Sequence, residues 1–278
     1  MKVDQIWKYP VKSMLGSRVT RADVSADGIV GDREWTLRDE QRGAIASARR
    51  VGGISRLAAA FAGGPNAVTI TLPDGARVKS TDRNANGRLS AAVGHPVSLW
   101  RRPPATEKGF WGQGKPDSED MLTEVRTIMG REGDEPLPDF SIFPPEMLEY
   151  EYPPGTLYDC FPLMIMSTSA IRSLRRALPD SVIDERRFRP SLIVDTGDAD
   201  GHPEFDWRGR RVRIGTTELQ IGSGCPRCVT ITREFTPDLP SDRRVLRHVV
   251  KDLDQNVGVY ATVIAGGTVN VGDVVDVA

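Results

Sequence analysis

Short runs of apolar residues alternate with turn residues over the first hundred positions, where Gly, Pro and Asp separate one run from the next. Short apolar, β-branched runs bounded by such turns are typical of strands. The pattern predicts strands over residues 3–9, 18–24, 34–38, 68–72 and 97–101. This part of the chain is therefore expected to be rich in strands.

The pattern is lost between residues 102 and 156, which are dense in proline and acidic residues. Polar, proline-rich stretches of this length are typical of long connecting loops or lids. The segment nevertheless carries aromatic residues, namely Phe110, Trp111, Phe140, Phe143, Tyr150 and Tyr152. A passive linker remains an open alternative, but so many aromatics lead us to expect partial docking on the protein body.

Strands and helices alternate from about residue 157. An apolar strand over 163–166 leads into a helix with Thr168 and Ser169 among its cap candidates and apolar residues at helical spacing. Ser241 is expected to cap a second helix. Further strands are predicted at 192–194, 212–214, 218–221 and 229–231, followed by a closing hairpin of 257–265 and 268–277 about Gly266 and Gly267.

Composition narrows the class of protein. Of 278 residues, 39% are hydrophobic and 27% charged, and the net charge is −1. This balance gives no electrostatic reason to expect nucleic acid as a partner. The N-terminus shows no signal-peptide pattern, and no apolar run approaches the ~18 residues of a membrane helix. We therefore expect a cytoplasmic protein without a membrane anchor.

The sharpest local motif is the Cys-Pro-Arg-Cys sequence from Cys225 to Cys228, which lies in a glycine-rich turn between two predicted strands. A thiolate is a strong ligand for soft or borderline metals, and a neighbouring arginine such as Arg227 favours the anion. The favoured interpretation is a single thiolate that binds a metal. A structural zinc site, a redox pair and a buried inert cysteine pair remain open, although zinc would need ligands from distant positions.

Other candidate groups are cations and helix-start donors. Lys12 and Arg33 flank predicted strands, and Arg189 precedes a third, so each could contribute to an anion site. Thr168 and Ser169 begin a predicted helix, whose free N–H groups can bind phosphate. Taken singly, each residue is more often a surface charge or an ordinary cap.

Seven motifs occur in one order along almost the whole chain. They are Tyr-Pro-Val-Lys-Ser (9–13), Gly-Asp-Arg-Glu-Trp (31–35), the strand into Ser-Thr-Ser (163–169), Arg-Phe-Arg-Pro (187–190), Cys-Pro-Arg-Cys (225–228), Gly-Val-Tyr (258–260) and Val-Gly-Asp-Val-Val (271–275). The ordered set resembles the MOSC family (molybdenum cofactor sulfurase C-terminal domain) with its N-terminal β-barrel partner. Within it, the chain is similar to the group of the mitochondrial amidoxime-reducing component and its bacterial relatives.

The resemblance implies an α+β, β-rich fold, in which a strand-rich N-terminal domain packs on a MOSC β-barrel with a few helices. It divides the chain into an N-terminal MOSC-associated domain (1–101), a proline-rich insertion or lid (102–156) and the MOSC domain (157–278).

It also implies a molybdenum–molybdopterin cofactor with Cys228 as the metal ligand and the catalytic position, and with Cys225 only as a neighbour. The positions that match the family's cofactor-binding residues are Lys12, Ser13, Arg33, Thr168, Ser169, Arg189, Ser191, Arg227 and Tyr260. Ser191 stands where relatives often carry Asn, so a hydrogen bond to the pterin is expected to differ there.

The implied function is a molybdenum-dependent oxidoreductase that reduces N-hydroxylated or related N–O compounds. Its small-molecule substrate would receive electrons from a separate flavin, haem or iron–sulfur protein, because no cysteine follows Cys228 that could hold a cluster. The alternative is a protein that binds or carries the cofactor, or its sulfur, without turnover of its own. A pyridoxal-binding domain is absent from the sequence, so desulfurase activity is not inferred.

Overall fold

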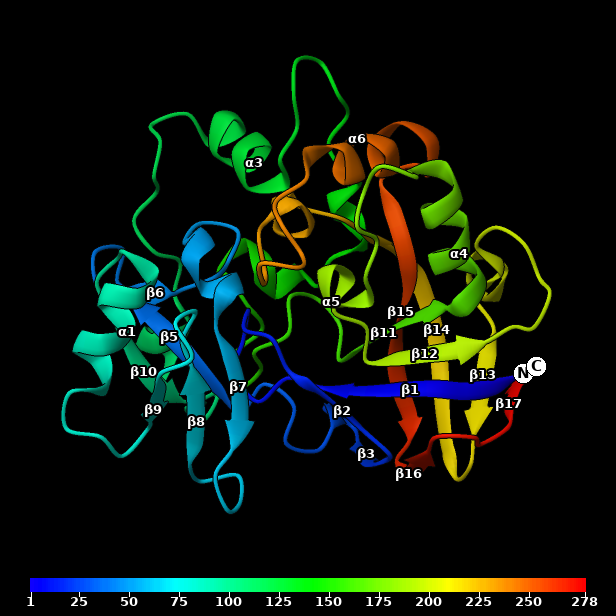
Figure 1. Cartoon of the computed structure of the whole chain (residues 1–278), viewed down its shortest axis with the longest axis horizontal. Helices are drawn as coiled ribbons and strands as arrows, with labels where there is room; N and C mark the ends of the chain where they lie inside the picture. The colour runs from blue at the N-terminus through cyan, green and yellow to red at the C-terminus, as the bar shows by residue number, and fades with distance from the viewer.

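The structure is a computed structural model that describes residues 1–278, apart from the side chain of Leu148. Its largest element is an eight-stranded mixed sheet (Figure 1). In spatial order the strands are β17 (Val275–Val277), β13 (Arg211–Ile214), β14 (Thr217–Pro226), β15 (Asn256–Ala265), β11 (Leu163–Ser167), β12 (Leu192–Asp195), β1 (Lys2–Lys8) and β2 (Ser17–Val19).

Three smaller sheets accompany it, and two of them form the N-terminal half seen at the left of Figure 1. These two are β10 (Val97–Arg101), β5 (Trp35–Asp39) and β6 (Ala44–Ile45), and β7 (Ala58–Phe61), β8 (Val68–Thr71) and β9 (Arg77–Lys79). The third joins β16 (Gly267–Asn270), β3 (Arg21–Ser25) and β4 (Gly28–Ile29).

The α-helices are α1 (Ala85–Val93), α2 (Lys108–Trp111), α3 (Met121–Met129), α4 (Thr168–Ala177), α5 (Glu185–Phe188) and α6 (Arg243–Asp252). The 3-10 helices are η1 (Gly52–Arg56), η2 (Phe140–Ile142), η3 (Pro145–Leu148), η4 (Pro203–Trp207) and η5 (Val229–Thr232). None of the helices in the described chain combines the length and the apolar character that crossing a bilayer requires.

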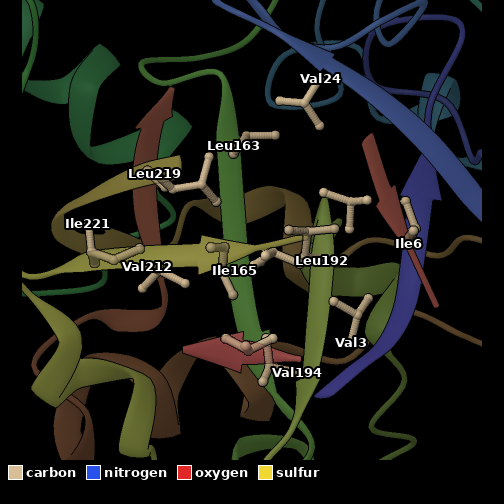
Figure 2. Packing of buried hydrophobic residues seen from close by; sticks show 14 of the residues in the cluster. Val3, Ile6, Val24, Leu163, Ile165, Leu192, Val194, Val212, Leu219 and Ile221 are labelled. Carbon is tan, nitrogen blue, oxygen red and sulfur yellow. The ribbon is translucent and has the colours of Figure 1, made fainter. Parts of the chain in front are cut away.

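The large sheet is buried on both faces at β11 and β12, where side chains that point to opposite sides are nearly all buried. On β11, Leu163 and Ile165 join one apolar cluster, whereas Met164 and Met166 join another. Figure 2 shows the first cluster, in which residues of β1, β11 and β12 pack together. The second cluster lies under α4 and α6, and the candidate site opens on this same side.

The first strand belongs to the sheet of the C-terminal half. β1 pairs antiparallel with β12, from Lys2 opposite Asp195 to Ile6 opposite Leu192. The chain ends meet there too, since the Val275 N–H donates to the carbonyl of Met1 at 3.0 Å (Figure 1). The N-terminal residues are therefore part of the framework that carries the C-terminal strands.

The α+β, strand-rich class predicted from the sequence is confirmed, but the large sheet does not close into a barrel over the described residues. Its ends approach each other through an isolated bridge between Lys2 and Val274 and a 2.9 Å bond from Val3 N to the carbonyl of Asp273. The sheet curls, yet its ladder has two free ends at β17 and β2.

Three local predictions were wrong. Residues 229–231 form the 3-10 helix η5, in which Ile231 N donates to the carbonyl of Cys228, because β14 already ends at Pro226. The second helix is capped by Asp242, whose carboxylate accepts from Arg244 N, and not by Ser241.

The closing hairpin is replaced by two separate pairings, β16 with β3 and β17 with β13. Glycine explains the first: a Cβ on Gly266 would lie 2.6 Å from the carbonyl oxygen of Val24, so only glycine permits this approach.

The segment 102–156 folds onto the protein body in part. Phe110, Trp111 and Tyr152 are buried with Ile45 in one apolar cluster, as expected from the aromatic content. Helix α3, which sequence reasoning missed, begins at Asp120, whose carboxylate accepts from the N–H groups of Leu122 and Thr123. A lid role for this segment remains a prediction.

Candidate functional site

One cavity collects residues from both halves of the chain. Of the positions predicted from the sequence, eight line it: Lys12, Ser13, Arg33, Arg189, Ser191, Arg227, Cys228 and Tyr260. They come from the loop after β1, the turn before β5, the turn between α5 and β12, the end of β14, and β15. The sequence therefore identified positions that are distant along the chain and adjacent in space.

Strained backbone positions three of these residues. Ser13, Arg33 and Arg189 have φ values of 66°, 50° and 58°, in the left-handed region that non-glycine residues rarely adopt. Such conformations cost ~1–3 kcal/mol each and persist only where surrounding structure holds them. All three line the same cavity, which concentrates strain at the candidate site.

Arg33 and Arg189 lie against the ring of Tyr9. The guanidinium carbons lie 5.5 and 4.2 Å from the ring centroid. Arg33 is paired with Asp32, whereas the guanidinium of Arg189 donates to the carbonyl of Met14. Burial, followed by the charge of Arg33, lowers the pKa of Arg189 to about 10, so it is cationic at neutral pH.

Arg227 is the basic residue of the cysteine motif, and it is buried. Its guanidinium donates to the carbonyl of Phe188 at 2.6 Å and to the sulfur of Cys225 at 2.9 Å. The Nε of Arg227 and the Nη2 of Arg189 are buried and have no hydrogen-bond partner among the described residues. An unpaired buried donor costs ~1–3 kcal/mol, and both atoms are available to donate to acceptor oxygens of a bound molecule.

The two cysteines of the motif differ sharply in environment. Cys225 is 3% exposed, and burial raises the pKa of its thiol against the opposing effect of Arg227. Cys228 is partly exposed at the cavity, with its sulfur 3.4 Å from the hydroxyl of Thr230. Arg49, Arg227 and Arg233 interact electrostatically with Cys228.

Lys12 is held by an acid that sequence reasoning missed. Its ammonium donates to Asp159 Oδ1 at 2.7 Å and to the carbonyl of Leu157 at 2.8 Å, and it lies 3.9 Å from the ring centroid of Tyr152. Arg49 donates to the same carboxylate at 3.2 Å. Asp159 is the only acid among the residues that line the cavity, and six lining residues are basic.

Ser13, Ser191 and Tyr260 line the cavity with side chains already engaged. The hydroxyl of Ser13 accepts from Ala48 N at 3.1 Å, and that of Ser191 accepts from Met164 N at 3.2 Å. Ser191 therefore supports the start of β11. The ring of Tyr260 lies on β15, where burial raises its pKa well above the ordinary value.

Thr168 and Ser169 are not brought to this cavity. They begin α4 at the far end of β11, whereas Met164 at the near end lines the cavity. At ~3.3 Å per residue the two ends are more than 10 Å apart. Ser169 instead hydrogen-bonds Thr196 at 2.8 Å within a buried polar network. The cap of α4 is Ser167, whose hydroxyl accepts from Ala170 N, so Thr168 and Ser169 lie in the first turn of the helix and outside the cavity.

Sequence reasoning also missed several lining residues, among them Ser47, Arg49, Asp159 and Thr230. Thr230 lies only two positions beyond Cys228, so proximity was an available signal. Arg49 and Asp159 offered none, since each lies in a stretch without strand or helix periodicity.

Comparison with known families matches these residues to two domains. Residues 153–276 match the MOSC domain, and residues 1–101 match the MOSC N-terminal beta barrel domain. The chain belongs to the MOSC family. The two matches leave residues 102–152 uncovered, and these residues make up most of the segment that differs in sequence character.

Curated relatives span almost the whole chain at low identity. The chain is 25% identical to mitochondrial amidoxime reducing component 2 of Macaca fascicularis and 24% identical to that of Homo sapiens, and each alignment covers 98% of this chain and 82% of the relative. Among solved structures, the YUAD protein from Bacillus subtilis aligns over 99% of this MOSC chain and 94% of its own, with 11% identity and a TM-score of 0.46.

The pH dependence of folding stability tests the burial of Lys12. Burial lowers the pKa of Lys12 from its ordinary 10.5 to about 8, against the opposing effect of Asp159. Below pH 8 both folded and unfolded chains hold the proton, so the burial cost is fully present. Between the two values the unfolded chain holds more protons, and folding stability rises with pH. Wild type should therefore gain up to about 3 kcal/mol relative to Lys12→Met across this window.

The measurement is urea unfolding of both proteins at a series of pH values. Lys251→Met, which removes a charge from an exposed position, is the control for loss of a surface lysine. Parallel curves for wild type and Lys12→Met would show that Lys12 does not lose its proton early in the folded protein.

Proposed function

We propose that this MOSC protein is a molybdenum-cofactor-dependent oxidoreductase that reduces N-hydroxylated or related N–O compounds. One observation carries the proposal: a partly exposed thiol, Cys228, opens on a cavity lined by cations from widely separated parts of the chain. The names of the curated relatives, as amidoxime reducing components, support the reaction class.

The residues fit the cofactor chemically. A molybdopterin carries a phosphate and a polar ring system, and the buried unpartnered donors of Arg189 and Arg227 are suited to acceptor oxygens of this kind. A single thiolate at Cys228 is a suitable metal ligand. The cavity would thus take an anionic group at its arginines while the metal lies at the sulfur.

The competing readings of the cysteine motif are weaker. Zinc needs several ligands, and no group of three or more metal-binding side chains gathers among the described residues. A redox pair needs two accessible thiols, whereas Cys225 is buried and accepts a hydrogen bond from Arg227. The single thiolate remains the best use of this geometry.

In this proposal the bound cofactor supplies two-electron chemistry at the metal. The overall reaction converts R–NH–OH, two electrons and two protons to R–NH₂ and water. The chain holds the thiolate of Cys228 in place, neutralises the cofactor phosphate with Arg33 and Arg189, and excludes water through Phe161 and Tyr260, whose rings lie 4.8 Å apart. The electrons would come from a separate reductase.

The metal ligand is tested by expression in a host that makes the pterin cofactor, followed by metal analysis. Wild type should contain molybdenum, Cys228→Ser should lose it, and Cys225→Ser should largely keep it because its thiol is buried against Arg227. Equal loss in both variants would indicate a two-cysteine site and contradict the assignment. Zinc in place of molybdenum would contradict the proposal as a whole.

Turnover is tested with benzamidoxime and an artificial electron donor. The loaded wild type should form benzamidine, and Cys228→Ser should not. A loaded protein that never turns over, with this or other N–O substrates, would instead be a cofactor-binding or sulfur-carrier protein. The two outcomes differ only in product formation, since both contain molybdenum.

If the cofactor binds in this cavity, substitutions of Arg189 and of Thr168, at the start of α4, should affect its retention differently. Arg189→Met should reduce retained cofactor about tenfold or more, because a charge-assisted hydrogen bond contributes ~1.5–3 kcal/mol. Thr168→Val should retain wild-type levels, since the structure places Thr168 outside the cavity. Cofactor per protein after gel filtration is the measurement. Loss in Thr168→Val without loss in Arg189→Met would show that the cofactor binds elsewhere.

A further inference from the structure

A buried arginine from outside both matched domains reaches the loop that carries Cys228. Arg131 follows α3 and its left-handed cap, Gly130, and it is 7% exposed. Its guanidinium donates to the carbonyl of Arg227 at 3.2 Å. That carbonyl belongs to the peptide bond that leads directly into Cys228.

Gln255 completes the contact. Its side-chain oxygen accepts from Arg131 Nη2 at 2.8 Å, and its backbone carbonyl accepts from the N–H of Arg227 at 2.8 Å. The backbone groups on both sides of Arg227 are therefore fixed, one by Gln255 and the other by Arg131. Gln255 itself has a φ of 68°, so the strained turn before β15 is part of the same arrangement.

A simple structural role does not account for all of this. Arg131 also donates to the carbonyls of Met129 and Pro136, which lie within its own segment and would tie that segment together without reaching residue 227. No carboxylate is hydrogen-bonded to its guanidinium among the described residues. A buried cation without an acid partner is costly, and contacts within its own segment do not explain why Arg131 is buried beside the loop of Cys228.

We propose that Arg131 is a positioning residue for the sulfur of Cys228. By holding the carbonyl of Arg227 it fixes the direction in which Cys228 presents its side chain. The inference rests on the proposed function, because it takes Cys228 to be the metal ligand. Removing a residue that orients a metal ligand typically lowers metal affinity by about 10–100-fold.

The test compares Arg131→Met and Arg131→Lys with a matched control, Arg126→Met. Arg126 belongs to α3 and donates to the carbonyls of Gly133 and Glu135, so its loss disturbs the same segment without touching the loop of Cys228. Full-length proteins are purified from a host that makes the cofactor. The readouts are molybdenum per protein, the Mo(V) electron paramagnetic resonance spectrum, and the rate at which iodoacetamide alkylates Cys228 in cofactor-free protein, followed by peptide mapping.

Arg131→Met should retain about tenfold less molybdenum, show a shifted spectrum in the remaining fraction, and alkylate at a changed rate at Cys228. Arg131→Lys should restore the charge but not the bridge, and so recover only part of the retention. Arg126→Met should lower thermal stability alone. Wild-type retention, spectrum and alkylation in Arg131→Met would overturn the proposal, as would equal changes in Arg126→Met.

Two further cases are an Arg131→Met variant that does not fold and a wild type that contains no molybdenum. If Arg131→Met does not fold, Arg131→Lys decides alone, because it keeps the charge without the fork that holds the carbonyl of Arg227. Wild-type retention, spectrum and alkylation rate in that variant would overturn the proposal. If wild type contains no molybdenum, the proposed function fails, while the alkylation rates of cofactor-free proteins still decide whether Arg131 positions Cys228.

Discussion

The burial of positive charge in one cavity constrains the rest of this structure. Six basic residues line the cavity and one carboxylate, Asp159, stands among them. Taking an ion out of water costs several kcal/mol, so each buried cation needs compensation. Lys12 and Arg49 share Asp159, and Arg189 uses the face of Tyr9. Arg187 uses carbonyls alone, including those of Ile231 and Arg233 just beyond Cys228. The folding of the loops around the cavity follows from these contacts.

The same constraint explains why the first residues belong to the sheet of the C-terminal half. Because β1 pairs with β12, the loop after β1 and the turn before β12 lie at the same end of neighbouring strands. Lys12 therefore faces the cavity alongside Arg189. The parallel pairing of β11 with β12 sends Thr168 to the opposite end. Strand direction thus decides which of the polar residues share the cavity and which lie at the start of α4.

Sequence reasoning succeeded where the signal was local and failed where it depended on pairing. Residues 97–101 are a strand with the predicted bounds, because an apolar run between turn residues is a local property. The prediction of a closing hairpin was wrong, because β16 pairs with β3, which is distant in the sequence, and a local pattern does not show this pairing. Thr168 was misassigned to the cavity for a similar reason, as a helix start does not reveal which end of the sheet it faces. Arg131 could not have been found, because a lone arginine in a proline-rich stretch is ordinarily a surface charge.

The surroundings of the two cysteines of the motif decide which thiol is accessible to a metal. Cys225 and Cys228 are three positions apart and both border the cavity, yet Cys225 is buried in the apolar cluster under α6, whereas Cys228 is partly exposed. The strand β14 ends between them at Pro226, after which the chain turns into η5. Arg227 bridges the two environments, since it donates to the buried sulfur while its remaining donor is unpaired. The contacts that hold Arg227 therefore determine the chemistry available to Cys228.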